Sequence, residues 1–509
     1  MVLEESKRIE RLNELISNKS IYFPSAEIYS KNFSGFFDYG PIGNKIRLNI
    51  IDFWRKELVR KNNFLEISGS LILPEDVFRA SGHLGNFDDP ISTCKKCGEV
   101  YRLDKVLSNQ LDKEVPENLT NEEYEKLLEE NEVLCTKCKT RIDNVSRFNL
   151  MANIIVGAKK GQKGYLRGES CQSIFLDFLR LYKTSRIGLP IAISQHGLVY
   201  RNEISPRNGL LRAREFEQLE TELFFDKDKI DDVNLEPYYN KIIRYRLLKD
   251  DSEKDYTVKE VKEQNISFGD IITYYTYLMN DFLEKIGIKH ENIRFREVSK
   301  EDRAFYSKQT FDLEVKTNKE WVELFCINYR TDHDLKAHAD GSKSTLSVKE
   351  DGKEILPHVL EVSSIGLGRL LYLILENNFE VIDVNNDGKD LRNVLKLKPK
   401  ISPYFMSVFP LVKKDGLLEL SKDLHSKLVE NSYDLFEINF DEKGSIGKRY
   451  ARMDEIGCNF CITVDHDTLE EKTVTIRDRD SFDQKRISVD KLLEVSKDLY
   501  FGKISFKDL

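Results

Sequence analysis

The stretch 199–225, VYRNEISPRNGLLRAREFEQLETELFF, constrains the fold of this 509-residue chain most strongly. Alternating residues flank a turn cluster that contains Pro206, Asn208 and Gly209. This pattern predicts two extended runs joined by a loop. A pair of long strands therefore lies at the centre of the expected fold.

The second of these runs has one apolar face and one polar face. Side chains alternate along a strand, so Leu219 and Leu223 share the apolar face, with Thr221 between them. The opposite face carries Phe216, Gln218, Glu220 and Glu222. A polar face on a strand whose back is apolar indicates a wet or charged site on that side.

Arginines gather around the same loop. The loop between the two runs contains Arg207, Arg212 and Arg214, and the first run carries Arg201 and Glu203. Guanidinium groups suit phosphate and carboxylate oxygens, so several of them near one place predict a polyanionic ligand. A surface hairpin covered with ion pairs is the alternative interpretation of this charge pattern.

The composition limits the classes of protein that remain. A chain of 509 residues exceeds what one core serves, so two or three domains are expected. With 40% hydrophobic and 33% charged residues the chain is expected to be globular, and no apolar run reaches the roughly 18 residues of a membrane helix. The first 20 residues mix acids with bases and contain no apolar signal region, which favours a cytoplasmic protein. The net charge of -8 argues against nonspecific coating of nucleic acid but leaves room for a local basic surface.

Four of the eight cysteines form two closely spaced pairs. Cys94 and Cys97 lie in CKKC, and Cys135 and Cys138 lie in CTKC. Two such pairs supply the four thiolates of a closed tetrahedral zinc site, so we predict structural Zn²⁺ at the base of an insertion over 90–147. The middle of this insertion is acidic and helix-prone, and we expect it to have little core of its own. Chance pairs of partly buried thiols are the alternative.

The chain beyond the central strands alternates between charged and apolar segments. The highly charged range 226–296 is predicted to be a second insertion of helical character. From residue 311 the strands FDLEVKT and WVELFCINYR lead to PHVLEVSSIGLGRLLYLILE. In that last segment we predict a strand with Val359, Glu361 and Ser363 on one face.

A glycine turn and a helix are predicted to follow this strand. The turn contains Gly366 and Gly368, and Arg369 lies in the first turn of the helix. Glycines allow a ligand to approach the backbone, and a helix N-terminus favours phosphate. The pattern indicates a second phosphate-binding element, although GLGR alone is a weak signal.

A domain boundary is predicted at LKLKPKISP, where proline and charge interrupt the periodicity. Before it, residues 1–396 form the main domain. After it, strands alternate with helices over 400–509, which predicts a small α/β domain. Cys458 and Cys461 open a strand in this domain and have no second pair nearby in the sequence, so buried free thiols are predicted there.

Taken together, these motifs resemble class II aminoacyl-tRNA synthetases, specifically the homodimeric glycyl-tRNA synthetase family. FFDYGPIG resembles the entry signature of that family, and SLILPEDVFRASGH resembles motif 1, with Pro74 at the dimer seam. RNEISPRNGLLRAREFEQLE resembles motif 2, and EVSSIGLGR resembles motif 3. GSIGKRYARMDEIG and VTIRDRDS resemble segments of the anticodon-binding domain. The resemblance implies an α+β fold: an antiparallel sheet flanked by helices, the zinc-bearing insertion with its four cysteines, and an anticodon-binding α/β domain.

The resemblance also implies an activity and its partners. The family attaches glycine to the 3' end of tRNA(Gly) with ATP, through a glycyl-adenylate, and uses Mg²⁺. A homodimer is implied, and no membrane is expected. Two alternatives stay open: an inactive relative that serves as a tRNA-binding or nucleic-acid-binding accessory subunit, and a class II synthetase for another amino acid. Arg201, Arg212 and Arg369 argue against the first because all three are present.

Roles of individual residues follow from the resemblance alone. Arg201 and Arg369 are implied as the catalytic residues. ATP binding is implied for Arg201, Asn202, Glu203, Leu211, Arg212, Phe216, Glu323, Leu324, Gly366, Gly368 and Arg369. Glycine binding is implied for Arg102, Glu169, Phe216, Gln218, Glu220, Glu361 and Ser363. The chain reads RGESCQS at 167–173 where the family usually reads RPETAQG, and its motif 3 is one residue longer, so either Ser363 or Ser364 takes the serine position.

Overall fold

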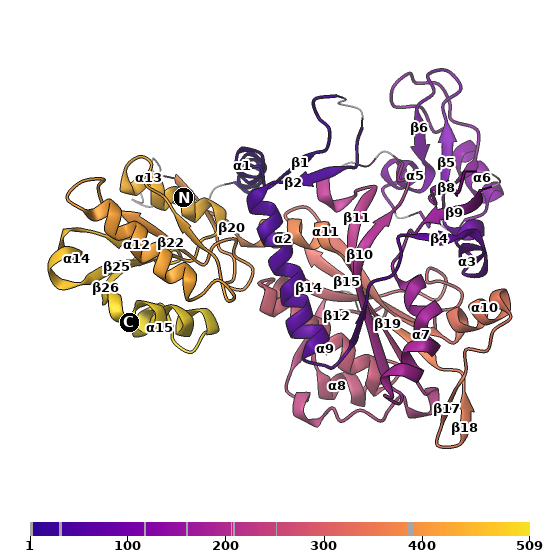
Figure 1. Ribbon diagram of the computed structural model, residues 1–509. Helices are drawn as coiled ribbons and strands as arrows, with labels where there is room; N and C mark the ends of the chain where they lie inside the picture. The colour runs from indigo at the N-terminus through magenta and orange to yellow at the C-terminus, as the bar shows by residue number, and fades with distance from the viewer. Residues whose placement is uncertain are drawn as a thin grey trace.

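The computed structural model describes residues 4–29, 33–113, 115–116, 119–158, 161–204, 206, 209–250, 252–383 and 391–509. A nine-stranded sheet forms the centre of the main domain, and a five-stranded sheet forms the C-terminal domain (Figure 1). In spatial order the nine strands are β13 (Lys254–Thr257), β12 (Ile242–Arg246), β14 (Ile293–Glu297), β15 (Gln309–Lys316), β16 (Trp321–Thr331), β19 (His358–Gly366), β11 (Glu215–Phe225), β10 (Ile191–Tyr200) and β3 (Leu65–Ile67). Neighbours are antiparallel except β12 with β14 and β10 with β3. The predicted antiparallel sheet is confirmed as a largely antiparallel, mixed sheet.

The predicted central strand pair is β10 and β11. The two strands pair antiparallel from Ile191 opposite Phe224 to Tyr200 opposite Glu215. Leu219 and Leu223 of β11 are buried in the main core, as their alternation predicts. Phe224 points the other way and stacks on Phe178 at a centroid distance of 4.2 Å. The two faces of β11 therefore meet different layers.

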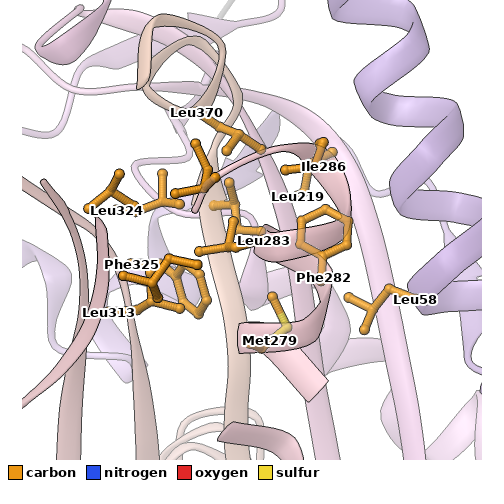
Figure 2. Close-up of a cluster of buried hydrophobic side chains, with 14 of the residues drawn as sticks. Leu58, Leu219, Met279, Phe282, Leu283, Ile286, Leu313, Leu324, Phe325 and Leu370 are labelled. Atoms are coloured by element: carbon orange, nitrogen blue, oxygen red, sulfur yellow. The ribbon is translucent and has the colours of Figure 1, made fainter. Parts of the chain in front are cut away.

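One face of the sheet is covered by α2 (Pro41–Trp54), α9 (Asp270–Ile286) and α11 (Leu367–Asn378). Figure 2 shows Leu219, Leu313 and Phe325 of the sheet against Phe282 and Leu283 of α9. The opposite face is covered at one end by α7 (Cys171–Ser185), which carries Phe178. Beyond α7, the polar side of β11 lines a cavity that a ligand can enter.

The range 226–296, predicted as a second insertion, is built into the main fold. It supplies β12, β13 and β14 to the large sheet and α9 to its core. Its charges occur in pairs on the strands, such as Arg244 with Asp255 at 2.8 Å. The charged composition thus reflects exposed strand faces, while α9 buries most of its side chains.

The cysteine-bearing segment forms a three-stranded sheet of its own. Its strands are β6 (Val100–Arg102), β5 (Asp88–Thr93) and β7 (Ser146–Asn149), and its helices are α5 (Leu103–Leu111) and α6 (Asn121–Glu130). Contrary to the expectation of little core, this segment has a buried cluster that contains Leu103, Leu107, Tyr124, Leu128, Ile142, Cys94 and Cys135. Beside it lies a second three-stranded sheet of β4 (Ile72–Pro74), β9 (Gln162–Leu166) and β8 (Asn153–Val156).

The C-terminal domain has strand order β23 (Ile438–Phe440), β22 (Met406–Pro410), β24 (Phe460–Val464), β25 (Thr473–Asp478) and β26 (Gln484–Ser488). Its helices are α12 (Leu417–Glu430), α13 (Ile446–Ile456), α14 (His466–Glu471) and α15 (Val489–Phe501). The predicted alternation of strands and helices is present, while β26 and α14 were missed because both consist mostly of polar residues. Cys458 and Cys461 are buried free thiols, as predicted.

The remaining elements complete the periphery of the main domain. They are α1 (Glu5–Asn18), β1 (Tyr22–Pro24), β2 (Phe37–Tyr39), α3 (Glu75–Ala80), α4 (His83–Asn86), α8 (Val258–Glu263), α10 (His333–Ser342), β17 (Val348–Glu350), β18 (Lys353–Ile355), β20 (Phe379–Asp383) and β21 (Leu391–Leu395). Within the part of the chain that the structure describes, no helix combines the length and the apolarity that crossing a bilayer requires.

Candidate active site

A cavity of about 260 Å³ opens on the polar face of β11. Strands β11, β16 and β19 form its floor, and the loop before β11 and the start of α11 form its sides. The residues named in the sequence analysis that line it are Glu169, Arg201, Glu203, Leu211, Arg212, Phe216, Gln218, Glu220, Glu323, Leu324, Glu361, Gly366 and Arg369. Segments that are far apart in the sequence therefore converge on one site.

One end of the cavity is cationic. Arg212 donates from Nε to Glu203 Oε2 at 2.7 Å. Arg369 in the first turn of α11 donates to the backbone oxygens of Leu211 at 3.3 Å and Glu323 at 2.5 Å. Burial lowers the pKa of Arg369 from its ordinary value, partly offset by the Glu323 carboxylate. Two guanidinium groups are thus held in place by carbonyl and carboxylate oxygens of the protein itself.

Arg201 lies between the cationic end and an acidic end. Its Nε donates to the Gly168 oxygen at 2.9 Å, and its Nη2 lies 3.4 Å from Glu169 Oε1. The guanidinium lies over the Phe216 ring at 5.5 Å and the Phe87 ring at 5.2 Å. These aromatic faces restrict the guanidinium plane, which suits a group that must meet an anion in one orientation.

The acidic end is a niche of buried carboxylates. Burial and the neighbouring charges of Glu361 and Glu169 raise the pKa of Glu220 well above its ordinary value. Burial also raises the pKa of Glu361, an effect that the Arg330 guanidinium opposes. Burial alone would raise the pKa of Glu169, but a hydrogen bond and charge from His83, together with Arg201, lower it below its ordinary value. The niche therefore contains more carboxyl groups than the neighbouring cationic side chains neutralise. A cationic group of a ligand would stabilise the ionised form of these carboxyl groups.

Arg330 is the main residue of the niche that sequence reasoning missed. It donates to both oxygens of Asp334 at 2.7 and 2.9 Å and to Glu361 Oε2 at 3.0 Å. The Tyr306 ring lies 5.0 Å from its guanidinium. Tyr306, Cys326 and Asn328 also line the cavity and were not predicted. An arginine directly before TDHD carried no signal in the sequence, because its role depends on partners that lie on other elements.

Two β-bulges decide which side chains face the cavity. Thr221 of β11 pairs with Ser363 of β19, but the next residue, Glu222, pairs with Glu361. Val362 is therefore an extra residue in β19. The expectation that Ser363 shares a face with Glu361 is therefore wrong, because the bulge shifts the alternation by one position. Ser364 lines the cavity and donates to Glu361 Oε1 at 2.7 Å, whereas Ser363 is buried and donates to the Leu219 oxygen. A second bulge at Leu324 brings Glu323 to the same face as Asn328.

Three further predicted residues lie beside the cavity without lining it. Arg102 in β6 is held by Asp104 at 2.8 Å and by Asp89 at 3.2 Å, and Asp89 lies 4.0 Å from Arg212. A side chain on Gly368 would meet Tyr39 Oη at 3.0 Å, so this glycine serves close helix packing. Asn202 donates its backbone N–H to the Leu150 oxygen. The predicted loop residues Arg207 and Asn208 lie outside the described residues.

The four paired cysteines form one cluster. Cys94 Sγ lies 3.4 Å from Cys138 Sγ, and Cys97 Sγ lies 3.6 Å from Cys135 Sγ. All four sulfur atoms lie within 4.8 Å of one another. Thiolates about 2.3 Å from a tetrahedral zinc would lie about 3.8 Å apart. The donor set and its spacing therefore fit a structural zinc ion.

Comparison with known proteins places the whole chain in one family. Residues 155–378 match the tRNA synthetase class II core domain (G, H, P, S and T), and residues 406–499 match the anticodon binding domain. The glycine–tRNA ligase of Methanothrix thermoacetophila is 33% identical, with 98% of this chain and 98% of that protein covered. The glycine–tRNA ligase of Pyrococcus horikoshii is 34% identical, with 97% of this chain and 99% of that protein covered.

A solved structure agrees at the level of the fold. It is titled as the RNA binding domain of threonyl-tRNA synthetase from Cryptosporidium parvum Iowa II, and it matches with a TM-score of 0.57 at 17% identity. The match covers 96% of this chain and 97% of that chain. The two glycine–tRNA ligases carry the similarity in sequence over the full length. The chain belongs to the glycine–tRNA ligase family of class II aminoacyl-tRNA synthetases.

Proposed function

We propose that this chain attaches glycine to the 3' end of tRNA(Gly) in two steps, with ATP as the energy source and glycyl-adenylate as the intermediate. The observation that carries the proposal is the single cavity in which Arg201, Arg212 and Arg369 adjoin a niche of buried glutamates. The guanidinium groups of the arginines suit the oxygens of a triphosphate, and the carboxylates suit an ammonium group. The cavity therefore offers groups that suit both reactants of the first step, which supports the proposal.

In the first step a carboxylate oxygen of glycine bonds to the α-phosphorus of ATP, and the bond to pyrophosphate breaks. We assign Arg201 and Arg369 to the phosphate oxygens, where their fixed positions neutralise the charge that develops. Phe216, whose ring faces the cavity, is assigned to the adenine. Glu203, which orients Arg212 through a hydrogen bond, lies beside the expected adenosine.

Glycine is distinguished by its charges and its size. Glu169, Glu220 and Glu361 are assigned to its ammonium group, and Ser364 replaces Ser363 as the serine that faces it. Arg330 and Tyr306 fill the space beside Glu361. Rejecting a larger amino acid by crowding is easier than rejecting a smaller one, and glycine has no smaller competitor.

In the second step a ribose hydroxyl of the terminal nucleotide of the tRNA attacks the carbonyl carbon of the mixed anhydride, and AMP leaves. This step forms an ester without a covalent enzyme intermediate, so we assign no side-chain nucleophile. The protein contributes by holding the two reactants in line. The RNA must therefore reach the acidic end of the cavity.

Two metal ions belong to the proposal. Glu323 offers a carboxylate on the cavity wall, the type of ligand that Mg²⁺ takes together with phosphates. Bound Mg²⁺ would supply charge neutralisation at the phosphates of ATP. The Cys94, Cys97, Cys135 and Cys138 cluster would hold Zn²⁺ in a structural role.

A homodimer is part of the proposal. The small sheet next to motif 1 exposes Ile72, Ile155 and Val156, which is unusual for a surface that faces only water. Pro74 ends β4 in the same sheet. A second copy packed against this sheet would cover these side chains, and light scattering would then give twice the chain mass.

The proposed function is tested by incubating the purified chain with ATP, labelled glycine and tRNA(Gly). We expect glycyl-tRNA to form and Arg201→Ala to abolish its formation. Leu248→Ala, an exposed position in the turn between β12 and β13, serves as the control and should retain activity. Binding of the tRNA without glycyl transfer would contradict the proposal and favour an accessory subunit.

A further inference from the structure

An exposed phenylalanine stands next to the acidic end of the cavity. Phe305 lies in the loop between β14 and β15 and is 82% exposed. Its neighbour in the chain, Tyr306, lines the cavity. The site described above gives Phe305 no role, because neither glycine nor the phosphates of ATP need a second aromatic face there.

The residues under Phe305 are well fixed. The Tyr306 ring stacks on His333 at 4.6 Å with 11° between the planes. Phe305 meets the same two rings edge to face, at 5.2 Å from Tyr306 and 5.1 Å from His333. Thr331 Oγ1 donates to the backbone oxygen of Tyr306 at 3.4 Å. Phe305 thus packs against the rings of Tyr306 and His333, while most of its own surface remains exposed and accessible to a ligand.

The contacts of Tyr306 show which end of the cavity Phe305 lies beside. Tyr306 contacts the Arg330 guanidinium at 5.0 Å, and Arg330 donates to Glu361 at 3.0 Å. Phe305 is therefore connected to the niche assigned to glycine. Phe216 and Arg369 mark the other part of the cavity, where the nucleotide is assigned.

The chemistry required at this end identifies the ligand. In the proposed second step, an unpaired RNA end must place its terminal ribose beside the glycyl group. Proteins hold unpaired bases by stacking them on exposed aromatic side chains, because every base has a π-face. We propose that Phe305, supported by Tyr306 and His333, stacks against the base at the 3' end of the RNA during glycyl transfer. This inference rests on the proposed function.

The test separates the two steps with two variants. Phe305→Ala removes the ring and Phe305→Tyr keeps it. Glycine-dependent exchange of pyrophosphate into ATP needs no RNA and reports the first step. Single-turnover transfer of glycine from preformed adenylate to tRNA(Gly) reports the second. Loss of one stacked base is expected to lower the single-turnover rate constant of transfer at sub-saturating tRNA by roughly ten-fold to a hundred-fold in Phe305→Ala.

The outcomes are distinct. The inference is supported if Phe305→Ala slows transfer, Phe305→Tyr restores it, and the loss falls on the RNA-dependent step alone. Leu248→Ala removes another exposed apolar side chain and should change neither step. Normal transfer by Phe305→Ala overturns the inference, as does an equal loss in pyrophosphate exchange. Absence of glycine-dependent exchange in the unmodified chain overturns the proposed function itself.

Discussion

Glu220 is the residue on which the proposed binding of glycine depends most. It is fully buried, accepts a hydrogen bond from Ser170 Oγ at 2.9 Å, and has a pKa raised by burial and by two neighbouring carboxylates. An ammonium group placed among these carboxylates would bring the pKa of Glu220 down, because it stabilises the ionised form. Binding of glycine is therefore expected to be coupled to ionisation of the Glu220 carboxyl group.

We predict that Glu220→Gln raises KM for glycine by roughly ten-fold to a hundred-fold, because a hydrogen bond to a charged group contributes about 1.5 to 3 kcal/mol. KM for ATP should change little, since Glu220 lies in the acidic niche. Steady-state pyrophosphate exchange at varied glycine measures both constants. An unchanged KM for glycine in a folded variant would remove Glu220 from the site.

Sequence patterns predicted single residues well only where a strand alternates without interruption. Phe216, Gln218 and Glu220 face one cavity, as their spacing of two required. Ser364 could not be placed because a bulge in β19 shifts the faces by one position, and a bulge depends on the partner strand. Arg330 gave no signal because its partners Asp334 and Glu361 lie on other elements. The ion pairs that hold Arg102 beside the cavity join it to acids of its own segment, and the family resemblance gave no information about them.

At the scale of elements, α2 is joined to β11 by a partly buried ion pair. Both oxygens of Glu217 accept hydrogen bonds from Arg47 of α2, and His196 of β10 lies 2.8 Å away. Burial alone would raise the pKa of Glu217, but His196 and Arg47 lower it from 4.5 to about 2. A carboxyl group whose pKa is lower in the folded than in the unfolded state stabilises the fold fully at pH values above its unfolded pKa. This contribution is lost as the pH falls through the folded pKa.

We therefore predict that stability declines between about pH 4.5 and pH 2, partly through Glu217. The depressed pKa corresponds to roughly 3 kcal/mol at neutral pH. Glu217→Gln should lower the urea midpoint at pH 7 and flatten its dependence on acid pH. Midpoints measured at pH 7, 4 and 3 check both effects. If the urea midpoint of Glu217→Gln falls with pH as steeply as that of the unmodified chain, the ion pair does not set acid stability.

The cysteine cluster provides a second prediction for an element. Cys94→Ser should remove about one zinc ion per chain and lower thermal stability, because the metal joins two ends of the 90–147 segment. Metal analysis by mass spectrometry and a melting curve are the measurements. Cys458→Ser, at a buried free thiol in the other domain, is the matched control and should keep the zinc. Unmodified protein without zinc would contradict the assignment.

Elements were easier to predict than their packing. The strands and helices of 400–509 follow clear changes of period, and the short β26 and α14 were missed. The role of 226–296 was not predictable from its charge, because the charged residues of strands such as β12 mask the apolar face that joins the sheet. The small core of the zinc segment was missed because its apolar residues are widely spaced.

At the scale of the whole molecule, direct contacts join the main domain to the C-terminal domain. Lys19, directly after α1, lies 2.5 Å from Glu455 of α13, and Asn49 of α2 donates to the Ser402 oxygen at 2.8 Å. Arg479 donates to the oxygens of Leu397 and Gly457, so it joins the connecting segment to the C-terminal fold. These contacts fix the main domain, which carries the cavity, against the domain that matches an anticodon binding domain.

In the proposed function, one cavity joins a triphosphate site to a niche that admits only glycine. Pyrophosphate exchange into ATP, measured with each of the twenty amino acids in turn, separates this arrangement from a site for another amino acid. We expect exchange with glycine and roughly a hundred-fold less with alanine, because a methyl group would be crowded out of the niche. Equal exchange with alanine, or exchange driven by a larger amino acid but not by glycine, would contradict the proposed function.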